Sequence, residues 1–307
     1  MVKVAVFMST YNGEKYLREQ IESILAQKHV KVFLYVRDDG SSDTTVDILK
    51  EFKENKKLEF YVGENINYGK SFWELMLKYG EAEKFDYFAF SDQDDYWEPV
   101  KLFKALDLLG SNAHPKLYFS NMEFVSSDLK SIGLKKFDNM RISLGSEMIR
   151  HRVAGCTYVF NKSLFEFAKY VDFTSFKKKF EHDVWLYILC LSVEGEVIRD
   201  KSSYIKYRQH SDNVTGHRQG LIKRMRREVL SHYLYQEKKN LKQSYFLCLY
   251  KHYEDYISNE NKKIIEQVIN YKTNLGSKIN LLKNKDFRSG NFVFDTISIL
   301  EVFFGVY

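Results

Sequence analysis

Residues 85–97 have the sequence FDYFAFSDQDDYW, which joins a short apolar run to a cluster of acids. The run at residues 87–90 predicts a buried strand, and Pro99 predicts that a helix begins soon after the acids. The carboxylates of Asp92, Asp94 and Asp95 are therefore expected at the carboxyl end of a strand. Open α/β sheets bind their ligands at that position.

Three carboxylates this close repel one another, so their pKa values rise unless a cation or hydrogen bonds compensate. A divalent metal compensates directly, and oxygen ligands suit Mg²⁺ or Mn²⁺ better than zinc. The alternative is an acidic loop that only caps the helix near Pro99. That alternative is favoured for an isolated Asp-x-Asp, but the other motifs of this chain reverse the preference.

The first 110 residues alternate between predicted strands and amphipathic helices, with short connections between them. The strands are expected at residues 4–8, 32–36, 58–62 and 87–90. This alternation predicts an α/β fold with a mostly parallel, twisted sheet, helices on both faces and right-handed crossovers. Polar turns follow the first, second and fourth strands, so we expect them to meet in one cleft at one edge of the sheet.

Beyond Ser120 the pattern becomes irregular. A hairpin turn, two helices and two strands are expected at residues 128–133, 163–171, 184–191, 197–198 and 204–207. From about Gly216 strand alternation disappears, and apolar and basic residues mix at helical periods. The sequence therefore predicts two domains, an α/β domain at residues 1–215 and a helical C-terminal appendage at residues 216–307.

Composition constrains the protein class less strongly. The chain has 307 residues, 44% of them hydrophobic, and a net charge of +6, which favours acidic partners such as phosphates or anionic lipid. Cys156, Cys190 and Cys248 have no metal-ligand spacing and lie among apolar neighbours, which predicts buried thiols in a reducing compartment. The absence of a signal peptide and of an 18-residue apolar run predicts a cytoplasmic protein.

A basic cluster occurs early in the C-terminal region. Its members are Arg218, Lys223, Arg224, Arg226 and Arg227. A solvated face is the favoured interpretation, although such a cluster also permits peripheral contact with an anionic membrane surface. Nucleic-acid binding is disfavoured because the acidic motifs oppose it.

Asp39 lies at the end of the second strand, in the segment RDDGSSD at residues 37–43. An ionised carboxylate only accepts hydrogen bonds, so Asp39 can accept the imide N–H of uracil or thymine. The alternative is a turn followed by a helix N-cap formed by Ser42 or Asp43, and it is favoured for this motif taken alone.

His210 and Asp183 are two further candidates. His210 follows a predicted strand, and its imidazole can complete a Mn²⁺ shell begun by carboxylates, although a lone histidine is more often packed or solvated. Asp183 precedes the helix expected at residues 184–191. A carboxylate there either caps the helix or acts as a general base, and spacing alone favours neither role.

Taken together, these segments resemble a family 2 glycosyltransferase of the GT-A fold. The matching motifs, in matching order, are VAVFMSTYNG at 4–13, RDDGSSD at 37–43, SDQDDYW at 91–97, EHDVW at 181–185 and YRQHSDN at 207–213. The variant SDQDDYW at residues 91–97, together with NYGKSF upstream at residues 67–72, looks most like the bacterial rhamnosyltransferase-like branch. That branch builds capsule, O-antigen or cell-wall polysaccharide.

The resemblance implies roles for individual residues. Donor binding is implied for Thr10, Tyr11, Asp39, Asn67, Lys70 and Asp92. Acceptor contacts are implied for Gly155, Glu181 and Trp185. Asp94 and His210 are implied to bind a divalent cation, Mn²⁺ or Mg²⁺, and Asp183 is implied to be the catalytic base.

The activity implied by the resemblance is inverting, metal-dependent transfer of one sugar, with L-rhamnose from dTDP-rhamnose preferred over a UDP-hexose. The implied acceptor is a lipid-linked saccharide. The Gln-x-x-Arg-Trp motif and the membrane spans of processive synthases are absent from the sequence, which favours one transfer per encounter. Two rivals are a phosphohydrolase, whose acids belong after the first strand, and a nucleotide-sugar-binding subunit without catalysis.

Overall fold

A computed structural model describes residues 1–307 except 82, 111–112, 139, 172–179, 211–235 and 306, and for residues 236–243 it describes only the backbone. The predicted basic cluster at residues 218–227 lies outside the described residues. The chain divides into two compact units. The first comprises Met1–Phe137, Val153–Cys190 and Gly195–Asn213, and the second comprises Asp138–Arg152, Leu191–Glu194 and Val214–Tyr307.

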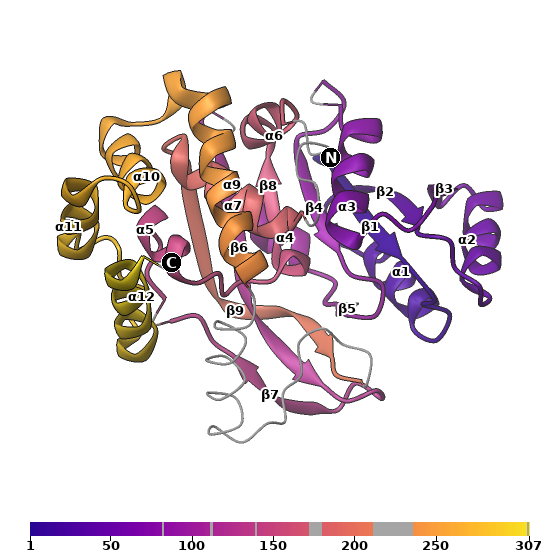
Figure 1. The fold of residues 1–307 in the computed structure, drawn as a ribbon. Helices are drawn as coiled ribbons and strands as arrows, with labels where there is room; N and C mark the ends of the chain where they lie inside the picture. Colours follow the sequence, from indigo (N-terminus) through magenta and orange to yellow (C-terminus); the bar gives the residue numbers. More distant parts are fainter. Residues whose placement is uncertain (82, 111–112, 139, 172–179, 211–235, 306) are drawn as a thin grey trace. The chain divides into compact units, whose positions relative to one another are not determined.

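A nine-stranded sheet organises the first unit (Figure 1). Its strands are β1 (Lys3–Thr10), β2 (Lys31–Asp38), β3 (Leu58–Val62), β4 (Tyr87–Ser91), β5 (Tyr96–Trp97), β6 (Lys116–Val125), β7 (Ser131–Lys135), β8 (Val159–Asn161) and β9 (Glu196–Arg208). The strand order is β3-β2-β1-β4-β8-β6-β9-β5, and β7 pairs with β6. β1 to β4 are mutually parallel and β9 is parallel to β6, whereas β5, β7 and β8 pair antiparallel. The expected mostly parallel sheet is therefore confirmed.

In the parallel half of the sheet, the inner strands β1 and β4 are apolar and buried on both faces, whereas the edge strand β3 exposes Glu59 and Val62. Residues 4–8 of β1 are fully buried, as expected for a strand covered by helices on both sides. The register places Thr10 opposite Asp38 and Met8 opposite Ser91. As a result, the turns after β1, β2 and β4 leave the sheet at the same edge, as the sequence predicts.

Helices cover this sheet and close its core. In the first unit they are α1 (Leu17–Leu25), α2 (Thr45–Glu54), α3 (Tyr68–Tyr79), α4 (Lys101–Leu109), η1 (Gly155–Thr157), α6 (Lys162–Ala168) and α7 (His182–Ser192). The apolar stripe of α1, Leu17, Ile21 and Ile24, is fully buried, as helical spacing predicts. α3 packs on β1 and β2, so its first turn is held near the end of β2.

One local expectation is wrong, and one short strand was not expected. The strands expected at residues 197–198 and 204–207 are a single strand, β9, because its register against β6 shifts at Ser120 and Asn121 and so accommodates the polar residues between them. Residues 96–97 form β5, which the sequence did not predict. β5 pairs antiparallel with residues 205–206 and ties the acidic loop to β9.

The second unit is helical in its described part. Its helices are α5 (Leu144–Ile149), α9 (Gln236–Tyr253), η3 (Glu254–Tyr256), α10 (Asn259–Asn270), α11 (Leu275–Lys283) and α12 (Phe292–Phe304). α10 packs on α9 and α11, and α12 packs on α5 and α11. C-terminal helices after the sheet are therefore confirmed. Among the described residues, none of the helices combines the length and apolarity required to span a bilayer.

Candidate active site

The two acids in the turn after β2, Asp38 and Asp39, have different hydrogen-bond partners. Asp38 is fully buried and shapes the turn, since its carboxylate accepts from the Gly40 and Ser41 N–H groups at 3.1 and 2.8 Å. It also accepts from Thr10 Oγ1 at 2.9 Å. Thr10 is itself buried, so its predicted role in binding the sugar donor is indirect and acts through the residues around it. The second acid, Asp39, points to different partners.

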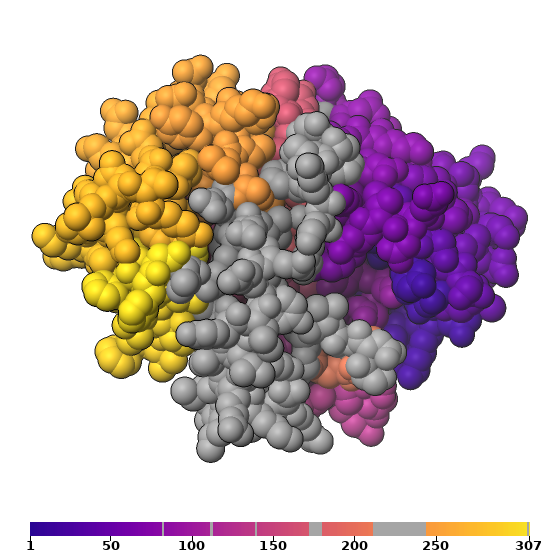
Figure 2. Space-filling model, viewed as in Figure 1, coloured from indigo at the N-terminus to yellow at the C-terminus, as the bar shows by residue number. Residues whose placement is uncertain are grey.

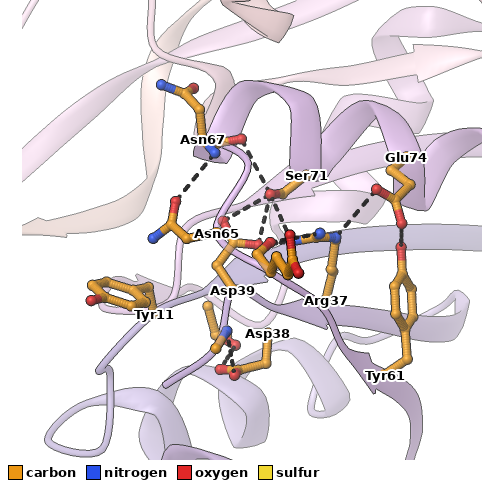
Figure 3. A network of polar contacts seen from close by, with 12 residues as sticks. Tyr11, Arg37, Asp38, Asp39, Tyr61, Asn65, Asn67, Ser71 and Glu74 are labelled. Atoms are coloured by element: carbon orange, nitrogen blue, oxygen red, sulfur yellow. Dashed lines mark hydrogen bonds and ion pairs between the residues drawn. The ribbon is translucent and has the colours of Figure 1, made fainter. Parts of the chain in front are cut away.

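Asp39 is held by a serine and an arginine (Figure 3). The Ser71 hydroxyl lies 2.7 and 2.8 Å from the two carboxylate oxygens, and Arg37 Nη1 forms an ion pair with Oδ1. Burial raises the pKa of the Asp39 carboxyl, whereas Ser71 and Arg37 lower it. One hydroxyl has one proton to donate, so lone-pair capacity on this carboxylate remains for a further donor.

The partners of Asp39 are fixed in turn by β3 and α3. Arg37 donates to the Glu64 carbonyl at 2.9 Å, and its Nε lies 3.5 Å from Glu74 Oε2. Glu74 also accepts from the Tyr61 hydroxyl at 2.7 Å. The buried guanidinium therefore has carboxylates on two sides, which compensates for its desolvation.

Asn67 connects this network to the start of α3. It has a φ of 82°, which is unusual for a residue other than glycine. Its side chain accepts from the Gly69 N–H at 3.2 Å, and its carbonyl accepts from the Ser71 N–H at 3.1 Å. Strained backbone concentrates at functional sites, and this residue is one of those implied in donor binding. Lys70, in the first turn of α3, is half-buried.

The side-chain amide of Gln93 joins the turn after β4 to the turn after β1. The Gln93 side chain accepts from the Tyr11 N–H at 2.9 Å and donates to the Tyr11 carbonyl at 3.1 Å. The Tyr11 side chain is left 49% exposed, so its ring is available to stack on a nucleobase. This pairing places Tyr11 beside the loop that contains the acids.

The two predicted metal ligands meet. His210 Nε2 lies 2.8 Å from Asp94 Oδ2, and both side chains remain partly exposed. Arg208 fixes this arrangement through its side chain and its backbone. Its side-chain Nε donates to the Asp94 carbonyl at 2.8 Å, and its backbone N–H donates to Asp95 Oδ1 at 3.1 Å. The same guanidinium pairs with Glu19. β9 is thereby attached to the acidic loop after β4.

Asp183 lies in the first turn of α7 and belongs to the same group of acids. Burial, together with the charges of Asp94 and Asp183, raises the pKa of Asp92 to about 7. Partial burial and the charges of Asp183, Glu181 and Asp92 raise the pKa of Tyr68. Each of these effects requires the charges to be close in space. The structure thus brings segments about 90 residues apart in sequence to one edge.

Gly155 lies directly against Asp183. A Cβ atom on Gly155 would come within 2.7 Å of His182 Nε2 and 3.1 Å of Asp183 Cβ, so only glycine permits this approach. Glu181 is half-buried just before α7, whereas Trp185 is fully buried in the protein core. The contact of Trp185 with an acceptor stays a prediction. Because the Trp185 ring is buried, direct contact would require it to become exposed.

Asp94 and His210 offer one carboxylate and one imidazole, as the predicted metal site requires. A second cluster, Asp92, Asp95 and Cys156, has ligand atoms within 4.8 Å of one another. Burial raises the pKa of the Cys156 thiol well above its usual value. A protonated thiol is a poor ligand for Mg²⁺ or Mn²⁺, whereas a carboxylate and an imidazole suit Mn²⁺.

Several residues of the site were not identified by sequence reasoning. They are Arg37, Ser71, Gln93 and Arg208. A signal exists for Arg37, because a charged residue at the end of the apolar strand VFLYV is unfavourable without a buried partner. Gln93, Ser71 and Arg208 make contacts with residues distant in sequence, so only the fold identifies their partners.

Comparison with known proteins agrees with this geometry. A model of the family described as Glycosyl transferase family 2 matches residues 5–165. The chain is 32% identical to dTDP-rhamnosyl transferase RfbG of Shigella flexneri over 217 residues, which cover 68% of this chain and 73% of that protein. It is 23% identical to the UDP-Glc:alpha-D-GlcNAc-diphosphoundecaprenol beta-1,3-glucosyltransferase WfaP of Escherichia coli, across 71% of this chain and 82% of that one. The resemblance to the rhamnosyltransferase-like branch is confirmed.

Solved structures show the same fold. TarS 1–349 of S. aureus in complex with UDP-GlcNAc matches with a TM-score of 0.58 at 14% identity, over 98% of this chain and 81% of that chain. The complex of the same protein with UDP matches with a TM-score of 0.55 at 16% identity, over 92% and 76%. The expected GT-A fold is therefore confirmed.

Proposed function

Because the chain belongs to glycosyl transferase family 2, we propose that it transfers one sugar from a nucleotide donor to a saccharide, with inversion at the anomeric carbon. The observation that best supports this proposal is the meeting of Asp94 and His210 at 2.8 Å, beside the acids Asp92 and Asp183. A cation-binding pair and a separate carboxylate at one sheet edge suit the departure of a diphosphate and the activation of a hydroxyl.

The donor that we propose is dTDP-rhamnose, with a UDP-hexose as the alternative. The first is supported by the similarity to a dTDP-rhamnosyl transferase, and the second by the resemblance of the fold to complexes with UDP and UDP-GlcNAc. Asp39 accepts the imide N–H of the base, which uracil and thymine share. Tyr11 stacks on the base or ribose, and Asn67, Lys70 and Asp92 contact the nucleotide.

We assign Asp94 and His210 as the residues that hold Mn²⁺ or Mg²⁺. The cation supplies stabilisation of the negative charge that develops on the diphosphate oxygens as the donor bond breaks. Arg208 keeps the two ligands together through its bonds to the Asp94 carbonyl and the Asp95 carboxylate.

Asp183 is proposed as the base. It accepts the proton of the acceptor hydroxyl while that oxygen forms a bond to the anomeric carbon, and the bond to the diphosphate oxygen breaks on the opposite face. A β-L-rhamnosyl donor therefore gives an α-L-rhamnoside. Because Gly155 has no side chain, it leaves room for the acceptor hydroxyl beside Asp183. Glu181 contacts the acceptor at the edge of the site. A general base contributes roughly 10²–10⁴-fold to the rate.

The acceptor that we propose is a lipid-linked saccharide used in bacterial surface polysaccharide synthesis, either capsule or O-antigen. The relatives RfbG and WfaP are named for activities on nucleotide sugars, and WfaP for a diphosphoundecaprenol acceptor. Residues 1–215 are proposed to be the catalytic domain, and residues 216–307 a separate helical region. Such an acceptor places the reaction at the inner face of the cell membrane.

Single-turnover assays with dTDP-rhamnose, UDP-glucose and UDP-GlcNAc, Mn²⁺ and a lipid-linked saccharide test the proposal. Asp183→Asn is expected to reduce transfer at least about 100-fold while donor affinity changes less than about threefold. Asp47→Asn changes an exposed carboxylate on α2 in the same way and serves as the control. Near-normal turnover of Asp183→Asn would refute the base assignment, and binding without transfer in the wild type would favour a non-catalytic subunit.

A further inference from the structure

The last helix, α12, exposes its apolar side chains. Phe292, Phe303 and Phe304 are 84%, 59% and 69% exposed, and Val293 and Leu300 are exposed as well. Positions 292, 300 and 303 share one side of a helix with 3.6 residues per turn. These side chains therefore form a continuous stripe. Figure 2 shows the yellow C-terminal residues at the surface of the molecule.

The opposite side of α12 is polar where a core-facing side is expected to be apolar. Ser298 and Glu301 are almost completely buried, and Asp295 accepts from the Ser289 hydroxyl at 2.7 Å. Only Val302 provides a large apolar group that is fully buried. The helix thus turns Ser298 and Glu301 inward, and it turns Phe292, Phe303 and Phe304 outward. Such a distribution indicates that an apolar environment covers the outer side.

The stripe continues onto α11. Leu275 is 72% exposed and Ile279, one turn later, is 41% exposed. Lys278 lies between them in sequence, and its Nζ is 6.0 Å from the centre of the Phe303 ring. The apolar side chains of the two helices are therefore neighbours. We call the set of Leu275, Ile279, Phe292, Val293, Leu300, Phe303 and Phe304 the apolar face.

The charge that α11 and α12 expose fully is basic. α11 contains no acid, and both acids of α12 are engaged inward, so neither helix, each described in full, presents a fully exposed carboxylate. Lys278 borders Phe303. Lys283 at the end of α11 is exposed. An anionic surface complements this arrangement.

We propose that the apolar face docks on an anionic lipid bilayer, with its phenylalanines at the boundary of headgroups and acyl chains and its lysines on lipid phosphates. With 13 residues, α12 is about 20 Å long, too short for an acyl core of about 30 Å, so it lies along the surface. A second copy of the chain fits less well, because a symmetric contact repeats the same patch and places cations against cations. The proposal does not depend on the proposed function.

Vesicle co-sedimentation of the full chain tests the proposal. We expect binding to vesicles of phosphatidylcholine with phosphatidylglycerol and much weaker binding to phosphatidylcholine alone or in 0.5 M salt. Phe303→Ser with Phe304→Ser is expected to weaken binding by roughly tenfold or more. Leu247→Ser removes an equally exposed apolar side chain from α9 and is expected to leave binding unchanged.

A second variant separates charge from apolarity. Lys278→Glu keeps the apolar face and is expected to weaken binding only to vesicles that contain the anionic lipid. Circular dichroism and UDP affinity show whether each variant is folded, since no change is expected in either. Vesicle binding that is absent in the wild type, or equal in the double Phe variant, overturns the proposal. Sedimentation velocity tests the alternative occupant. If the wild type does not bind vesicles but forms a dimer, and the double Phe variant is monomeric, the apolar face contacts a second copy instead.

Discussion

His210 Nε2 lies 2.8 Å from Asp94 Oδ2, although 116 positions separate the two residues in sequence. The end of β9 and the loop after β4 meet because β5 pairs with β9 and because Arg208 bonds to the backbone of that loop. The proximity of these two proposed metal ligands is thus a product of the sheet topology. His210 lies far outside the acidic motif that contains Asp94, so only the fold brings the two side chains together.

The first prediction concerns this pair. His210→Ala removes one of two proposed ligands, so we expect the Mn²⁺ concentration that gives half-maximal transfer to rise by at least about tenfold. Titration of transfer activity with Mn²⁺ measures the effect. His114→Ala, at an exposed histidine that pairs with Glu196, is the matched control. Identical Mn²⁺ curves for His210→Ala and the wild type would remove His210 from the metal site.

The second prediction concerns the serine that holds Asp39. Ser71→Ala removes a hydroxyl that lies 2.7 and 2.8 Å from the carboxylate oxygens, so Asp39 loses its fixed orientation. In the wild type, methylation at N3 of UDP should weaken binding by at least about tenfold, because it removes the imide donor. In Ser71→Ala that penalty should shrink several-fold. Calorimetry of UDP and N3-methylated UDP, each with the wild type and with Ser71→Ala, gives a thermodynamic cycle. The cycle measures the coupling between the Ser71 hydroxyl and the imide N–H. An unchanged methylation penalty would limit Ser71 to a structural role.

The third prediction concerns a buried lysine on α4. Lys101 is fully buried, its Nζ lies 3.5 Å from the centre of a Trp97 ring, and desolvation lowers its pKa to about 7. In the unfolded chain the pKa is near 10.5, so the unfolded state binds more protons between these values and stability rises with pH across that window. Below pH 7 the folded state carries the full cost of the buried charge.

Lys101→Met is therefore expected to increase the free energy of unfolding at pH 6, by on the order of 3 kcal/mol after the contact with Trp97 is considered. The gain should shrink steadily as the pH rises from 7 towards 10.5. Urea unfolding at pH 6 and pH 9 measures both values. A gain that is equal at the two pH values would show that Lys101 does not titrate in this range.

The fourth prediction concerns the glycine beside the base. Gly155→Ala adds a Cβ that would lie 2.7 Å from His182 Nε2 and 3.1 Å from Asp183 Cβ. We expect Asp183 to shift, so the rate of transfer should fall by at least about tenfold while stability falls by about 1–3 kcal/mol. Transfer kinetics and urea unfolding separate the two effects. A normal rate in a folded Gly155→Ala protein would show that this close approach does not position the base.

The parallel half of the fold was predictable because each of its strands is a short, mainly apolar run bounded by polar residues. The position of the acids after β4 follows directly from that pattern, since parallel strands end at one edge. The continuity of β9 was not predictable, because the polar residues 199–203 interrupt the apolar run and only pairing with β6 holds them in a strand. The two-residue strand β5 is too short to give any periodic signal.

The candidate site was partly predictable for a similar reason. Charged residues next to predicted elements are visible in the sequence, and these include Asp39 and Asp94 after strands and Asp183 at the start of a helix. The groups that orient them are not visible, because Ser71, Gln93 and Arg208 act through contacts across the fold. The orientation of α12 was also hidden, since its sequence is apolar on most sides and does not reveal that Ser298 and Glu301 face inward.

The most direct test of the metal-dependent donor site is calorimetry of dTDP binding with Mn²⁺ and with EDTA, for the wild type and Asp94→Asn. We expect the wild type to bind dTDP at least about tenfold more tightly with Mn²⁺, and Asp94→Asn to bind it equally weakly in both buffers. Equal dTDP affinity of the wild type with Mn²⁺ and with EDTA would show that the donor site does not use a metal.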